Sequence, residues 1–117
     1  PELASEFLRR RKGDLSKRFA QGAVDAAVQA HTQAETVASR KASQLALEHF
    51  TAALPELLGG SADLTGSNLT NTASTPALRF DLAGQVVRDD QGRLGRHINY
   101  GVREFGMAAV MNGVALH

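Results

Sequence analysis

Apolar side chains recur at three- and four-residue steps between residues 39 and 54, the spacing of a helix with one buried face. The stripe contains Ala42, Leu45, Ala46, His49, Phe50, Ala53 and Leu54. Pro55 follows directly and is expected to end the helix, because proline cannot continue its hydrogen bonding. This stretch carries the strongest helical pattern of the chain.

Residues 1–36 show a weaker version of the same period. We predict two helices there, with a break near Gly13 and a weak point at Gly22, since glycine disfavours helix interiors. Their apolar faces are small and consist largely of alanine. Such a segment is too poor in large apolar residues to form its own core, so we expect it to pack across a larger body as a linker.

After Pro55 the pattern changes from helical to extended. Residues 57–60 (LLGG) predict a short buried strand, and residues 61–68 (SADLTGSN) form a loop of small and hydroxyl side chains. Helix, strand and polar loop in this order are typical of an open α/β sheet. Ligands of such sheets bind beyond the carboxyl ends of the strands, which makes the loop a candidate binding site.

The remaining sequence consists of short apolar pieces separated by turn residues. The apolar pieces are residues 78–80 and 85–87. Residues 88–93 predict a surface turn, and the tip of a hairpin is one structure that such a turn can form. Residues 97–100 predict a brief strand, and 102–117 a final helix. That helix would carry Val102, Phe105, Ala109, Gly113 and Leu116 on one face.

Composition narrows the function classes. The 117 residues are 43% hydrophobic and 21% charged with a net charge of +1, which indicates one small globular domain at most. The near-neutral charge gives no electrostatic case for binding nucleic acid or a membrane surface. The absence of cysteine excludes disulfides, thiolate metal sites and cysteine nucleophiles.

The ends of the sequence and its apolar runs add two expectations. No run approaches the ~20 apolar residues that cross a bilayer, and no signal peptide opens the chain, so a cytoplasmic location is expected. The sequence begins at Pro1 without methionine and ends at His117 within an apolar pattern. We therefore expect a piece of a larger protein.

Three features stand out as candidates for chemistry. Loop 59–68 has glycines and hydroxyls that suit phosphate oxygens, but also suit an ordinary turn. Arg40 opens the strong helix and is either a solvent-facing cation or a phosphate ligand. Glu104 lies in the first turn of the last helix among apolar neighbours; it is either a helix-favouring acid or, if buried, an acid active near neutral pH.

Other polar residues are assigned structural roles. The four histidines, at positions 31, 49, 97 and 117, show no spacing typical of metal ligands, and His49 lies on the apolar stripe as a core histidine. The basic run 9–18 is interrupted by Asp14 and contains no aromatic residue, which favours a solvated helix face over a nucleic-acid site.

Three stretches together resemble the transketolase family. They are residues 39–44 (SRKASQ), 59–70 (GGSADLTGSNLT) and 100–107 (YGVREFGM), and they occur in the order in which that family has them. The resemblance is weak over 1–36 and strong from 39 onward. It implies a helical interdomain linker at 1–36 and, at 37–117, the first portion of an α/β pyrimidine-binding domain with an open parallel sheet.

The resemblance also implies an activity. Transketolases are thiamine-diphosphate-dependent homodimers that transfer a two-carbon ketol unit from a ketose phosphate to an aldose phosphate. Glu104 matches the glutamate whose carboxyl group hydrogen-bonds ring nitrogen N1′ of the cofactor and promotes its imino tautomer, whose 4′-imino group then removes the C2 proton. Arg40 and Ser67 match residues for the substrate phosphate. Asp63 matches an aspartate near the cofactor and the dimer interface, with a structural role in the loop as the alternative.

The family motif for the divalent metal, Mg or Ca, is absent here, so the metal ligands are expected outside this chain. As an isolated polypeptide the chain is expected to be inactive. The alternatives are a truncated, non-catalytic interaction module derived from a transketolase, or a related enzyme such as dihydroxyacetone synthase or 1-deoxyxylulose-5-phosphate synthase. Whether the pathway is the pentose phosphate route or carbon fixation stays open.

Overall fold

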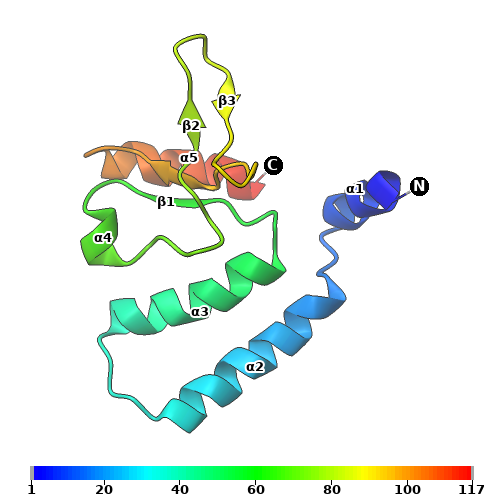
Figure 1. The fold of residues 1–117 in the computed structure, drawn as a ribbon, viewed down its shortest axis with the longest axis vertical. Coiled ribbons are helices and arrows are strands. Elements are labelled where there is room, and N and C mark those ends of the chain that lie inside the picture. The colour runs from blue at the N-terminus through cyan, green and yellow to red at the C-terminus, as the bar shows by residue number, and fades with distance from the viewer. Residues whose placement is uncertain (1, 117) are drawn as a thin grey trace. The chain divides into compact units, whose positions relative to one another are not determined.

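The computed structural model describes residues 2–116, so Pro1 and His117 lie outside the described residues. The chain forms two compact units, of which the first ends at Leu57 and the second begins at Leu58. The first unit contains α1 (Glu2–Lys12), α2 (Lys17–Gln33) and α3 (Ser39–Ala53) (Figure 1). The second contains β1 (Gly59–Ser61), α4 (Thr65–Asn68), β2 (Arg79–Phe80), β3 (Val86–Val87), β4 (His97–Asn99) and α5 (Glu104–Leu116).

Helices α2 and α3 lie side by side in the first unit (Figure 1). The rings of Phe19 and Phe50 meet between them with centroids 5.6 Å apart. The predicted break at Gly13 is confirmed: its φ of +73° belongs to the turn between α1 and α2. Helix α2 continues through Gly22, so the weak point expected there does not break the helix. A Cβ at Gly22 would lie 3.9 Å from that of Ala53, so this position lies against α3.

Helix α3 ends where the proline predicts. Its last residue is Ala53, and the amide of Leu54 still donates to the carbonyl of Phe50 at 2.8 Å. Leu57 then donates to the carbonyl of Leu54, which closes a turn around Pro55. The predicted buried strand at 57–60 is therefore wrong in its bounds. Leu57 and Leu58 are 36% and 44% exposed, and the strand begins only at Gly59.

The second unit confirms an α/β fold with a small parallel sheet. Strand β1 pairs with β4 in parallel, in the register Gly59 with His97, Gly60 with Ile98 and Ser61 with Asn99. The brief strand predicted at 97–100 is thus confirmed as His97–Asn99. Because the two strands are parallel, their carboxyl ends lie at the same edge of the sheet.

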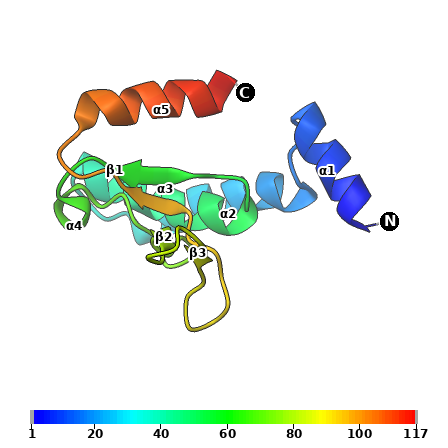
Figure 2. The ribbon, with the colours of Figure 1, turned by 90° about the horizontal axis from the view of Figure 1, so that it is seen from above.

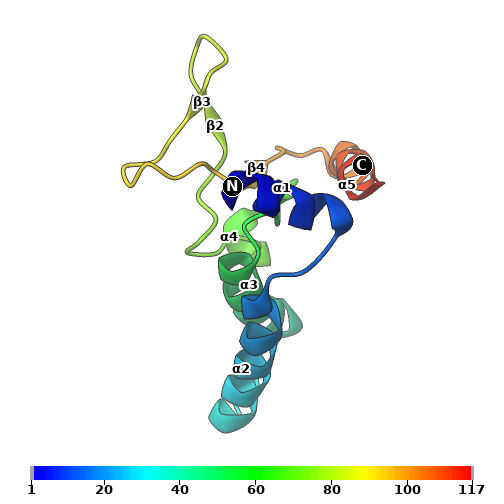
Figure 3. The same ribbon diagram turned by 90° about the vertical axis from the view of Figure 1, so that its right-hand side faces the viewer.

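Two turns follow one another between β2 and β4. Strands β2 and β3 form an antiparallel hairpin whose tip spans 81–85, where the Asp81 carboxylate accepts the amides of Ala83 and Gln85. The predicted turn at 88–93 is confirmed as a second loop, closed by an antiparallel bridge between Arg88 and Leu94. Figure 3 shows both loops extending from this unit.

Helix α5 begins at Glu104, so Val102 precedes the helix and does not belong to the face predicted for it. The helix runs alongside β1 (Figure 2). Its apolar side chains are largely open: Phe105 is 90% exposed and Val114 55%. Within residues 2–116, no helix is long and apolar enough to cross a membrane.

Candidate functional site

The loop after β1 is held by its own polar groups. The Ser61 hydroxyl donates to the carbonyl of Asp63, and the Asn68 side-chain amide donates to the same carbonyl at 3.3 Å. The Asp63 carboxylate accepts the amide of Leu64 at 2.8 Å. Leu64 takes the left-handed conformation (φ +41°) just before α4. The glycine- and hydroxyl-rich sequence thus folds into a turn with a defined backbone path.

Two sequence-predicted site residues, Asp63 and Ser67, are brought together in this loop. Both are exposed, and Ser67 lies in the single turn of α4. Among residues 2–116 the Ser67 hydroxyl has no hydrogen-bond partner, while its amide donates to the carbonyl of Leu64 at 2.9 Å. The hydroxyl is therefore available to a ligand. The Asp63 carboxylate takes part in loop structure, as its amide contact shows.

A histidine that the sequence analysis set aside lies next to this loop. His97 is only 3% exposed, and its Nε2 lies 3.3 Å from the Thr65 hydroxyl. That hydroxyl also lies 3.4 Å from Oδ1 of Asn99, to which it donates. Burial lowers the pKa of His97. Short-range spacing in the sequence does not reveal this contact, because Thr65 is 32 positions earlier in the chain than His97.

Glu104 begins α5, four residues after Tyr100, whose amide still donates to the carbonyl of Ser61 at 2.9 Å. The carboxylate therefore follows the carboxyl end of β4, where a ligand of a parallel sheet is expected. Between strand and helix, Gly101 turns the backbone with a φ of +65°, and the Arg103 guanidinium donates to the Tyr100 carbonyl. Glu104 is exposed, so the burial that its proposed acid role needs is not supplied by the described residues.

Arg40 belongs to the first unit, where it is the second residue of α3. Its side chain is exposed, and α3 has Ala38 at its N-cap, with no side-chain cap. A cation in this position opposes the helix dipole, which costs a few tenths of a kcal/mol to about 1 kcal/mol. The structure thus leaves the guanidinium open for an anionic ligand.

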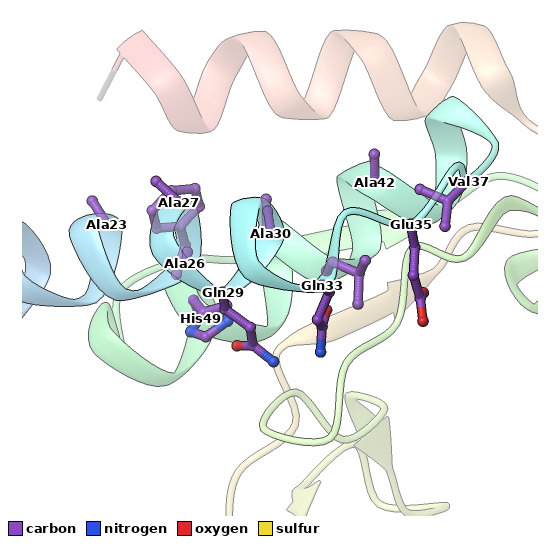
Figure 4. A pocket seen from close by; sticks show the side chains of 13 residues that line it. Ala23, Ala26, Ala27, Gln29, Ala30, Gln33, Glu35, Val37, Ala42 and His49 are labelled. Carbon is purple, nitrogen blue, oxygen red and sulfur yellow. The ribbon is translucent and has the colours of Figure 1, made fainter.

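A further cavity lies in the first unit. A groove of about 440 Å³ runs between α2 and α3, and six of its thirteen lining residues are alanines, whose small side chains leave space between the helices (Figure 4). His49, predicted as a core histidine, lines this groove and is half-buried. None of Arg40, Asp63, Ser67 and Glu104 lines it, so this cavity is separate from the predicted chemistry.

The donor set of the second unit suits part of a cofactor site. An open carboxylate such as Glu104 is the acceptor that a protonated ring nitrogen requires, and the apolar residues beside it on α5 suit an aromatic ring. For a metal the described residues offer less. Within 2–116 no three His, Asp or Glu side chains come close enough to share one ion.

Comparison with known proteins decides the family. The pyrimidine-binding domain of transketolase matches residues 35–117, which include β1, the polar loop, β4 and α5. The chain belongs to the transketolase family. The fold expected from the motifs, a transketolase pyrimidine-binding domain with a parallel sheet, is confirmed by this match and by the solved structures.

Curated transketolases match over the whole chain. The plasmid-encoded transketolase of Cupriavidus necator is 52% identical over 117 residues, and transketolase 1 of Escherichia coli is 44% identical. Among solved structures, a transketolase of Pichia stipitis in complex with sedoheptulose-7-phosphate covers 98% of the chain at 36% identity, with a TM-score of 0.69. The chain spans 16% of the length of each of these relatives.

Proposed function

We propose that this chain is the linker (1–36) and the first part of the pyrimidine-binding domain (37–117) of a complete transketolase. That enzyme would transfer a two-carbon ketol unit from a ketose phosphate to an aldose phosphate. The observation that carries the proposal is the placement of Glu104: an open carboxylate in the first turn of an apolar helix, directly after the carboxyl end of a parallel strand. Membership of the transketolase family supports the reaction class.

In this proposal Glu104 accepts a hydrogen bond from ring nitrogen N1′ of thiamine diphosphate and holds the proton at that atom. When bound, the cofactor supplies the nucleophilic carbon and the electron sink that ketol transfer requires. A positioned acid or base of this kind contributes about 10²- to 10⁴-fold to a rate. The divalent metal would be held by residues of the complete enzyme outside this chain.

The other candidate residues of the chain are proposed to bind the substrate phosphate or to hold the binding loop in place. Ser67 donates its hydroxyl to the phosphate of the sugar substrate, and Asp63 keeps the loop closed through the Leu64 amide while lying near the cofactor. Arg40 is proposed separately as a guanidinium ligand of a substrate phosphate, because its fork matches two phosphate oxygens. The Pichia stipitis complexes with xylulose-5-phosphate and sedoheptulose-7-phosphate support sugar phosphates as the substrate class.

A homodimer is proposed for the complete enzyme on the basis of membership of the transketolase family. Phe105 is 90% exposed and Leu116 88%, an apolar surface that the remainder of the complete enzyme would cover. The cytoplasmic location and the pentose phosphate pathway stay predictions.

The test is ketol transfer by the complete polypeptide that contains this chain, measured with and without added thiamine diphosphate and a divalent metal. The wild-type enzyme should show cofactor-dependent transfer. Glu104→Gln should lower kcat by at least about 10²-fold at saturating cofactor, with an unchanged melting temperature. Asp90→Asn, which removes a carboxylate that is also exposed from the 88–93 turn, is the matched control and should behave as wild type.

Two outcomes contradict the proposal. Unchanged turnover of the Glu104→Gln enzyme would remove Glu104 from the cofactor role. A complete polypeptide that binds the cofactor but transfers no ketol unit would favour the alternative, a non-catalytic interaction module. The isolated 117-residue chain should be inactive, and cofactor-dependent turnover by that chain would refute the division of the active site proposed here.

A further inference from the structure

Among residues 58–116, His97 is the least exposed titratable side chain, with a relative exposure of 3%. Its backbone is fixed on both sides: its amide donates to the carbonyl of Pro76 at 3.1 Å, and its carbonyl accepts the amide of Leu78 at 2.8 Å. It is also paired with Gly59 in the parallel sheet. These backbone contacts fix the position from which the imidazole extends. Burial lowers the pKa of the ring, which favours its neutral form at pH 7.

The ring belongs to a short chain of polar contacts. Its Nε2 lies 3.3 Å from Oγ1 of Thr65, and the Thr65 hydroxyl donates to Oδ1 of Asn99 at 3.4 Å. A hydroxyl has one hydrogen, so with that hydrogen directed to Asn99 the imidazole donates from Nε2 to Thr65. His97 and Asn99 are two residues apart on β4 and share one face of the strand. Both side chains therefore reach the same hydroxyl.

Thr65 connects this face of the strand to the turn that carries Ser67. It is the first residue of α4, and its carbonyl accepts the amide of Leu69 at 2.9 Å. The residues on either side of α4, Leu64 and Leu69, both take the left-handed conformation. The turn's internal hydrogen bonds fix its own backbone path, and contacts from its side chains to β4, such as that of Thr65, fix where the turn and Ser67 lie relative to the sheet.

We propose that His97 is a positioning residue for the phosphate-binding turn: through the Thr65 hydroxyl it holds α4 so that Ser67 presents its hydroxyl to the phosphate of the sugar substrate. The inference rests on the proposed function, which assigns Ser67 to that phosphate. His97 touches neither substrate nor cofactor in this role. A displacement of about 1 Å at a contact of this kind is enough to weaken binding strongly.

The experiment compares two acceptors in the complete enzyme: an aldose phosphate and a short aldehyde without phosphate. Thr65→Val removes the hydroxyl at nearly constant volume, and His97→Leu removes the ring donor. Each should raise KM for the phosphorylated acceptor about tenfold, the effect of one weakened hydrogen bond to a charged group. For the unphosphorylated acceptor kcat/KM should stay at the wild-type value, as should the affinity for thiamine diphosphate.

Rescue and coupling separate positioning from a general structural role. Thr65→Ser keeps the hydroxyl and should restore KM to near the wild-type value. The double variant with Thr65→Val and His97→Leu should be no worse than either single variant, because both act through one contact. If His97→Leu fails to fold, the comparison of Thr65→Val with Thr65→Ser still tests the contact.

The possible failures are distinguishable. A wild-type enzyme that transfers no ketol unit contradicts the proposed function and this inference with it. If the wild-type enzyme is fully active and Thr65→Val impairs the reaction with both acceptors equally, or with neither, the positioning role alone is overturned. Ser67→Ala, assayed in parallel, should show the same selective rise of KM for the phosphorylated acceptor. If its KM does not rise, Ser67 does not bind the phosphate, and the role of His97 that depends on Ser67 is also refuted.

Discussion

Replacing Gly60 by alanine should open the parallel sheet, whereas the same change at Gly59 should not. A Cβ at Gly60 would overlap the carbonyl oxygen of Ile98 on the paired strand and would lie 2.7 Å from Cε2 of Tyr100. It would also lie 3.1 Å from the Ile98 carbonyl carbon, well inside the ~3.5–4.0 Å of an ordinary carbon contact. A Cβ at Gly59 meets nothing within 4 Å.

The magnitude follows from what must move. The Ile98 oxygen belongs to the backbone and cannot rotate away, so β1 and β4 must separate. Overpacking of this kind costs about 1–3 kcal/mol. Separation also weakens the bond from the Tyr100 amide to the Ser61 carbonyl, for about 1 kcal/mol more. Gly60→Ala should therefore destabilise the pairing of strands β1 and β4 by about 2–4 kcal/mol. Gly59→Ala should change stability by less than ~1 kcal/mol, with the sign favouring alanine.

Hydrogen exchange at the strand pair is the assay, because a large enzyme does not unfold in two states. In the complete enzyme, exchange of the Tyr100 amide should accelerate about 30- to 1,000-fold in Gly60→Ala, since each 1.4 kcal/mol is a factor of ten. The Gly59→Ala enzyme should exchange at close to the wild-type rate. Equal exchange in the two variants would refute the argument that backbone approach at Gly60 requires glycine.

Three further changes test separate features of the chain. Arg40→Ala should raise KM for phosphorylated substrates about 10- to 100-fold and leave an unphosphorylated acceptor unaffected, with Lys41→Ala as the neighbouring cation control; equal effects on both acceptors would argue against phosphate contact. The hydrogen bond from the backbone amide of Arg93 holds the pKa of Asp89 below its usual 3.8. The ionised carboxylate therefore stabilises the 88–93 turn fully above pH 3.8. This stabilisation is lost as the pH falls through the lower pKa of the folded state. Amide exchange in that turn should therefore rise, beyond its intrinsic pH dependence, only below about pH 3.8, and Asp89→Asn should abolish the transition; a transition that persists in Asp89→Asn would assign it to another group. The Thr70 hydroxyl is buried without a partner among residues 2–116, so Thr70→Val should leave the melting temperature unchanged or raise it. Thr72→Val, which removes a buried hydroxyl 2.8 Å from that of Thr75, should lower it; equal shifts would show that the Thr70 hydroxyl is satisfied.

Local sequence signals predicted those elements that local forces determine. Gly13 and Pro55 mark boundaries because one adopts a positive φ and the other lacks an amide hydrogen. Helix α3 follows its apolar stripe, and the 88–93 turn follows its Asp and Gly residues. In each case the responsible residues lie within a few positions of the feature they fix.

The errors concern features that distant partners decide. The apolar pair Leu57–Leu58 suggested a strand, but the strand begins at Gly59 because its partner β4 and the close approach at Gly60 set the register. Local spacing does not predict the contact of His97 with Thr65, because the two residues are 32 positions apart in the sequence and close only in the fold. The alternation of His97 and Asn99 along a predicted strand is the signal that would have placed both on one face.

Glu104 and the apolar surface of α5 impose one physical requirement together. An acid that shares a proton with a ring nitrogen works best where water is excluded, yet Glu104 is exposed and begins a helix whose large side chains are also exposed. Each large apolar side chain that becomes covered contributes about 1.5–3 kcal/mol, so association over α5 is favourable without any help from the carboxylate. Burial of Phe105, next to Glu104 in the chain, would exclude water from the start of the helix as well. In the proposed enzyme, the part of the molecule that covers α5 therefore also gives the glutamate the environment that its chemistry needs.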